Sequence, residues 1–77
     1  MRWWWHPPCV LDRVVVNLRN TPDEALRGIF WSMRGGWITL RDVTGLVTGR
    51  EPTPIEGEVI VHVDHVAYIQ KITTVVQ

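Results

Sequence analysis

Two neighbouring segments with a two-residue repeat constrain the fold of this chain more than any other feature. In LRGIFWSM, residues 26–33, every second side chain from Leu26 to Phe30 shares a face, and WITLRDV, residues 37–43, has the same repeat. Such alternation is typical of a β-strand with one buried face, because successive side chains point to opposite sides. A glycine pair at positions 35 and 36 lies between the segments, which together predict a β-hairpin.

Three more strands are predicted outside this hairpin. The segment RVVVNL, residues 13–18, is apolar and β-branched, and turn-forming residues follow it. After a loop rich in glycine and proline, residues 45–57, come EVIVHV at 58–63 and VAYIQKITTVV at 66–76. Residues 64 and 65 form a sharp joint between these last two strands. Helical periodicity is almost absent, so we expect an all-β protein.

Five short strands in so short a chain predict a small antiparallel barrel, because closing the sheet removes the unpaired edges that promote aggregation. A glycine in the middle of a strand, Gly28, predicts tight curvature at that point. In the segment 37–43 the repeat places Asp42 on the same face as Ile38 and Leu40. We expect one face of each strand to form the core, which includes Val14, Val16, Leu26, Phe30, Ile38, Leu40, Val59, Val61 and Ile69.

The size of the chain indicates that it needs a partner. Its 77 residues suffice for one domain with a marginal core. The single cysteine, Cys9, excludes an internal disulfide, and Cys9 and the three histidines lack the spacing of a structural zinc site. Self-association or another protein is the remaining source of stability. Lys and Arg total 8 and Asp and Glu total 8, so there is no overall basic field to attract nucleic acid.

The N-terminal residues 1–12 predict an extended arm in front of the domain. Trp3, Trp4 and Trp5 are followed by Pro7 and Pro8, which favour polyproline backbone. The apolar run is too short for a secretory signal or a membrane span. We expect the tryptophans and the two prolines to form an interface arm that is buried against another subunit or a different protein. Two alternatives remain: the arm folds over its own barrel, or it anchors the chain at a membrane surface.

Catalytic and metal-binding chemistry has few candidates. His62, Asp64 and His65 would have to converge to hold a metal, and His65 lies past the predicted joint. His6 and Cys9 could act as base and nucleophile, but no third group that would orient them is evident. We therefore expect no catalytic residue, no metal site, no cofactor and no enzymatic activity.

The order of the predicted strands resembles the two-part signature of Sm-like proteins, over residues 13–72. In that signature the bent second strand has a glycine, matched by Gly28, and the third strand has a leucine and an aspartate, matched by Leu40 and Asp42. Two apolar residues that are three positions apart, matched by Val66 and Ile69, end the second part. The resemblance implies a five-stranded antiparallel Sm-like barrel over residues 13–77, in which strand edges pair between copies.

The same resemblance bears on RNA binding, which is the activity of many Sm-like proteins. Their base-contacting asparagine is replaced here by Trp37, and their arginine-glycine pair by His62 and Val63. We therefore do not expect nucleic acid as a partner, and an Sm-like RNA-binding regulator is kept as the alternative function. Trp31 and Trp37 are candidates for an interface or for base stacking.

A second resemblance suggests where the protein acts. The segments RGIFW, GGWITLRDV and GEVIV are similar to those of small proteins encoded among the virion-assembly genes of tailed phages that infect actinobacteria. The resemblance implies a non-catalytic virion protein of the capsid, the head–tail connector or the tail. Such a protein would be assembled in the host cytoplasm, would contact itself and other virion proteins, and would not span a membrane. A membrane-surface accessory protein is the third hypothesis.

Overall fold

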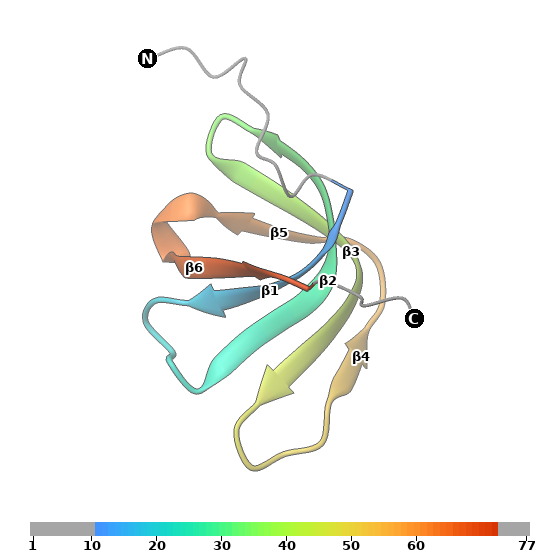
Figure 1. Cartoon of the computed structure of the whole chain (residues 1–77), viewed down its shortest axis with the longest axis vertical. Helices are drawn as coiled ribbons and strands as arrows, with labels where there is room; N and C mark the ends of the chain where they lie inside the picture. The colour runs from blue at the N-terminus through green and yellow to red at the C-terminus, as the bar shows by residue number, and fades with distance from the viewer. Residues whose placement is uncertain (1–10, 73–77) are drawn as a thin grey trace.

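A computed structural model of the protein describes residues 11–72, and its regular structure consists of strands and one short 3-10 turn (Figure 1). The all-β prediction is therefore confirmed for this part of the chain. The arm residues Trp3, Trp4, Trp5, Pro7 and Pro8, together with His6 and Cys9, lie outside the described residues. In chain order the elements are β1 (Arg13–Leu18), β2 (Glu24–Arg34), β3 (Trp37–Val47), β4 (Thr53–Ile55), β5 (Val59–His62), the 3-10 turn η1 (Val63–His65) and β6 (Val66–Lys71).

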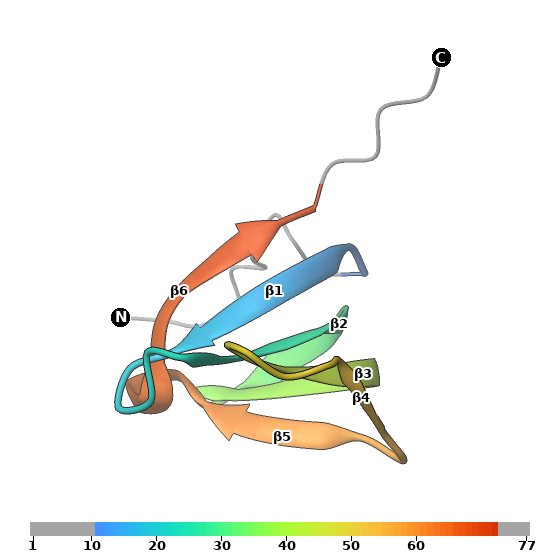
Figure 2. The ribbon, with the colours of Figure 1, turned by 90° about the horizontal axis from the view of Figure 1, so that it is seen from below.

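The strands form one antiparallel sheet in which β3 has two partners on the same edge. The order is β4-β3-β2-β1-β6, and β5 also pairs with β3. β4 pairs with the second half of β3, at Val43–Gly45, and β5 pairs with the first half, at Trp37–Leu40. Figure 2 shows the sheet curled, with β1 and β6 on one side, β5 on the other and η1 joining β5 to β6. Within residues 11–72 the hydrogen-bonded sheet is not closed.

The strand count differs from the sequence-based prediction of five strands. The extra strand is β4, which arises inside the loop that glycine and proline led us to expect at residues 45–57. Pro54 lies opposite Thr44 in this strand. A proline is compatible with an edge strand because its missing N–H would face outward, away from the single partner. The local composition therefore predicted the irregular loop correctly and missed the three residues that pair with β3.

The predicted hairpin is confirmed, and its strands are longer than expected. β2 and β3 each have 11 residues and pair from Glu24↔Val47 to Arg34↔Trp37. The glycines between them have φ angles of 57° and 83°. Two successive residues with positive φ are what a two-residue type I′ turn requires, which explains the glycine pair.

A bulge in β3 overturns the predicted position of Asp42. This residue has a φ of 54°, in the left-handed region, and its side chain is exposed. The pairing register of β2 and β3 shifts at the same level, next to Gly28. One extra residue in a strand reverses the alternation of side chains beyond it. As a result Val43, which the two-residue repeat placed on the outer face, is buried with 2% exposure.

The core lies on the inner face of the curled sheet and agrees closely with the predicted set. Of the predicted core residues, Val61 is half-buried and does not pack against the buried cluster, whereas Leu26, Val59 and Ile69 are half-buried and do. The fully buried members are Val14, Val16, Phe30, Ile38 and Leu40 from the predicted set, with Val43 added. Six buried side chains make a small core.

The predicted joint at residues 64–65 is the 3-10 turn η1. His62 precedes this turn, and its Nδ1 accepts a hydrogen bond from the backbone N–H of Asp64 at 3.1 Å. At the end of the turn the backbone N–H of Val66 bonds to Val63. The turn sends the chain from β5 on one side of the sheet to β6, which pairs with β1.

Candidate functional site

Large apolar side chains are exposed on the outer face of β2, β3 and β5. Trp31 is 41% exposed, Trp37 52% and Ile60 59%. Ile60 lies opposite Thr39 in the β3–β5 ladder, so its side chain is on the same face as Trp37 and Thr39. Trp31 reaches this face from a register shift in β2. We call Trp31, Trp37, Ile60 and the charged pair described next the outer aromatic face.

Arg41 contacts both Trp31 and Glu58 at one end of the outer aromatic face. Its guanidinium carbon lies 3.9 Å from the centre of the Trp31 ring, a cation–π contact. Its Nε donates a hydrogen bond of 2.6 Å to Oε2 of Glu58. The two charges cancel, so the face is apolar at its centre and neutral overall. Arg41 also holds the Trp31 ring in one place, which lowers the entropy that a docking partner has to remove.

Trp37 is held at the other end of this face by His62. The two rings meet edge to face, with centroids 4.8 Å apart and planes at 82°. Aromatic pairs favour this arrangement because the positive edge of one ring meets the negative face of the other. His62 is itself fixed by its bond to the Asp64 N–H, so Trp37 is positioned through η1 as well as through β3. The face therefore presents two indole rings, each in contact with a side chain from another strand or turn.

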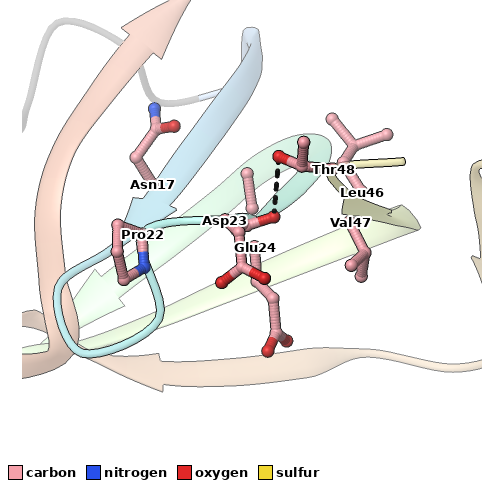
Figure 3. A pocket seen from close by; sticks show the side chains of 8 residues that line it. Asn17, Pro22, Asp23, Glu24, Leu46, Val47 and Thr48 are labelled. Atoms are coloured by element: carbon pink, nitrogen blue, oxygen red, sulfur yellow. Dashed lines mark hydrogen bonds between the residues drawn. The ribbon is translucent and has the colours of Figure 1, made fainter. Parts of the chain in front are cut away.

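Two shallow hollows lie near the opposite end of β2 from Trp31. The acidic hollow, about 230 Å³ in volume, is lined by Asn17, Pro22, Asp23, Glu24 and Thr48, with Ala25, Leu46 and Val47 (Figure 3). Thr48 Oγ1 donates to the backbone oxygen of Asp23 at 3.3 Å, which fixes the turn before β2 against the end of β3. Figure 3 shows the Asp23 and Glu24 carboxylates projecting on the same side of this turn.

The apolar hollow adjoins the acidic one and has a volume of about 240 Å³. Leu18, Leu26, Leu46 and Ile55 form most of its wall, and Glu24 and Ala25 line both hollows. Leu18 and Leu26 also pack against the core. The hollow thus adjoins the core, and Ile55 of β4 lines it.

The structure brings some of the sequence-predicted candidates together. Trp31 and Trp37 come from different strands and share the outer aromatic face. His62 Nδ1 and Asp64 Oδ2 are 3.4 Å apart, but no group of three or more His, Cys, Asp and Glu side chains in residues 11–72 is placed to hold a metal ion. In the same residues no helix is long and apolar enough to cross a bilayer.

Sequence reasoning missed Ile60 and the joint role of Arg41 and Glu58. Ile60 belongs to an apolar strand, and the β3–β5 register shows that its side chain lies on the outer face. The alternation within EVIVHV places Val59 and Val61 on one side and Ile60 on the other, so this signal was available. The Arg41–Glu58 pair joins residues 17 positions apart and has no local signal.

Comparison with known proteins adds no family assignment. No family model matches this chain, and no curated protein is similar to it at a significant level.

Proposed function

We propose that this chain is a non-catalytic assembly protein of a tailed-phage virion that acts through protein–protein contacts. The observation that carries the protein–protein part of this proposal is the outer aromatic face, where Trp31, Trp37 and Ile60 are exposed together. The proposed position is the capsid, the head–tail connector or a tail accessory. The chain would reach it by assembly in the host cytoplasm.

The chemistry of the outer aromatic face favours a protein as the partner. Tryptophan is the residue most enriched among side chains that dominate binding energy, and arginine is also enriched there. The rings of Trp31 and Trp37 already contact Arg41 and His62, and such contacts reduce the ordering cost of binding. The neutral Arg41–Glu58 pair gives a polar margin without the strong positive potential of a nucleic-acid surface.

The virion setting rests on the resemblance of RGIFW, GGWITLRDV and GEVIV to small phage proteins. The basic residues are seven arginines and one lysine, Lys71, and this bias is in keeping with a GC-rich genome such as that of an actinobacterial phage. We propose in addition that the curled sheet is a variant of the Sm-like barrel. The close approach of Gly28 to β3 and the return of β6 to β1 through η1 support this assignment.

The experiment compares particle incorporation of variants of the outer face. Trp31→Ser and Trp37→Ser are introduced together into the phage genome that encodes the chain, and purified particles are quantified by mass spectrometry. The matched control is Tyr68→Ser, because Tyr68 is an aromatic residue on β6 that is 58% exposed and does not belong to the outer aromatic face.

We expect the wild type and Tyr68→Ser to be present in particles at equal copy number. The double variant should be depleted although the purified protein remains folded by circular dichroism. Equal incorporation of all three proteins would show that the outer aromatic face is not needed for assembly into particles. Absence of the wild-type chain from purified particles would overturn the virion assignment.

A second candidate function is an Sm-like RNA-binding regulator. The observation that favours it is the exposed Trp31 ring with a guanidinium against it, since bases stack on tryptophan and arginine. The RNA titration described in the Discussion separates the two functions.

A further inference from the structure

The N-terminal part of the described chain pairs with one half of β2, and the two hollows lie at the other half. At one end, the backbone N–H of Leu11 donates to the Phe30 oxygen at 2.6 Å and the N–H of Phe30 donates to the Asp12 oxygen at 2.9 Å. Leu11 and Asp12 therefore join the sheet beside Phe30. At the other end, at Glu24–Leu26, lie the apolar and acidic hollows.

We propose that the N-terminal segment of one copy, with Trp3, Trp4 and Trp5, docks into the apolar hollow of a second copy. The contact is head-to-tail, because the segment leaves at one end of β2 and the hollow lies at the other. A contact of this kind builds rings or filaments from identical subunits, or closes as a dimer when two copies exchange their segments reciprocally. The inference rests on the proposed function, because it names a partner surface for the assembly protein.

The chemistry of the two partners is complementary. The segment 1–10 has three tryptophans, the basic residues Arg2 and His6, and no acidic residue. Among the described residues that line either hollow, Asp23 and Glu24 are the charged ones, and both are exposed. The hollow thus offers an apolar wall for an indole ring, with carboxylates at its margin for a cation. Burying one aromatic side chain in the hollow removes about 150–250 Å² from water in each contact.

Distance favours a second copy over the chain's own hollow. Leu26 and Phe30 are four residues apart along β2, about 13 Å at the strand rise. The backbone already turns at Leu11, which has a φ of 70°, and a segment docking in its own hollow then has to run back along this length beside β1. Pro7 and Pro8 favour extended backbone, which suits a segment that reaches outward. Docking in a second copy does not require the segment to run back along its own sheet.

The test uses two full-length variants that remove complementary halves of the contact. The arm variant carries Trp3→Ser, Trp4→Ser and Trp5→Ser, and retains the hollow. The hollow variant carries Ile55→Glu, and retains the arm. Ile55 lines the hollow and is 37% exposed, and the matched control is Ile72→Glu, because Ile72 is also 37% exposed and does not line the hollow. Mass photometry and sedimentation velocity report the assembly state, and circular dichroism reports folding.

We expect the wild type and Ile72→Glu to assemble, and the arm and hollow variants to require at least ~10-fold higher concentration for half-assembly. Mixing the two variants should then give a 1:1 dimer that grows no further, because one intact arm meets one intact hollow. Should Ile55→Glu fail to fold, Glu24→Arg replaces it, because this exposed side chain lines both hollows and reverses the charge.

Three results would overturn the inference. They are a wild type that stays monomeric, a mixture that forms no dimer, and an arm variant that stays unassembled only because its monomer has lost thermal stability. The last result would mean that the arm covers its own domain. Assembly that survives both variants and is lost in Trp31→Ser/Trp37→Ser would overturn the arm contact and leave the proposed function standing. The proposed function is tested separately, by measuring whether the wild-type chain is present in purified particles.

Discussion

Gly28 lies against the backbone carbonyl of Arg41, so closely that a Cβ atom at position 28 would be 2.8 Å from that oxygen. The same atom would be 3.2 Å from Cγ2 of the buried Val43. Because Gly28 has no side chain, the backbone of β2 can pack directly against the bulge of β3. Glycine is required here by the close approach of two strands.

Gly28→Ala is expected to destabilise the protein by about 1–3 kcal/mol, because the added methyl group meets backbone that cannot move aside. The change is measured by chemical denaturation followed by circular dichroism. Gly45→Ala is the control, since its Cβ would lie 3.4 Å from the flexible end of Ile55, an ordinary contact. Equal stability of Gly28→Ala and the wild type would show that the sheet can open at this point.

The change in stability on replacing Asp42 should depend on the backbone conformation at this position more than on the charge of the side chain. Its left-handed backbone, with a φ of 54°, disfavours β-branched residues. Asp42→Val is therefore expected to destabilise by about 1–2 kcal/mol. Asp42→Gly should be neutral or stabilising, because the 3.6 Å ion pair with Arg13 is exposed and contributes little. Thermal melts of the two variants decide this, and a melting temperature lower for glycine than for valine would contradict it.

Leu40→Ala should unfold a large part of the population. Leu40 is fully buried in a core of six side chains, and such a truncation costs about 2–5 kcal/mol. Ile60→Ala is the matched control in the neighbouring strand, because Ile60 is 59% exposed and should change stability little. Urea denaturation of both variants provides the comparison. A Leu40→Ala protein as stable as Ile60→Ala would remove Leu40 from the core.

RNA binding should be weak and of no specific kind. The expectation comes from the balanced charge and from Trp37, His62 and Val63, which stand where the proposed resemblance to Sm-like proteins would require base-contacting residues. In a titration of labelled single-stranded RNA at ~150 mM salt, we expect a dissociation constant no tighter than the ~10⁻⁴ to 10⁻⁶ M of non-specific binding. Trp37→Ser serves as the control. Submicromolar binding that this variant loses would favour the RNA-binding regulator.

Much of the fold could be predicted from the sequence because the strands carry local patterns. Alternation gave the hairpin and five of the six buried residues, and the glycine pair gave its turn. The bulge at Asp42 was not predictable in this way, because it depends on the approach of Gly28 from the opposite strand. A local repeat does not show at which residue a bulge interrupts the pairing of two strands.

The candidate site could be predicted only in part, for a related reason. Trp31 and Trp37 are conspicuous in the sequence, but their common face follows from the Arg41 contact and the β3–β5 register. The two hollows are made by side chains from four strands and the turns between them, and no single segment predicts them. The tertiary arrangement of β4 and β5 along β3 decides both surfaces.

The pairing of β1 with β6 also sets the order in which this protein can be completed. Asn17 bonds to Gln70 across 53 positions, so the edge of β1 that does not pair with β2 stays unpaired until almost the whole chain has been synthesised. The β2–β3 hairpin is joined by two residues and can form as soon as it leaves the ribosome. Closing the long loop costs more entropy than closing the hairpin. Until β6 arrives, the edge of β1 is bare during translation, and the nascent chain has to avoid its neighbours on the same messenger RNA.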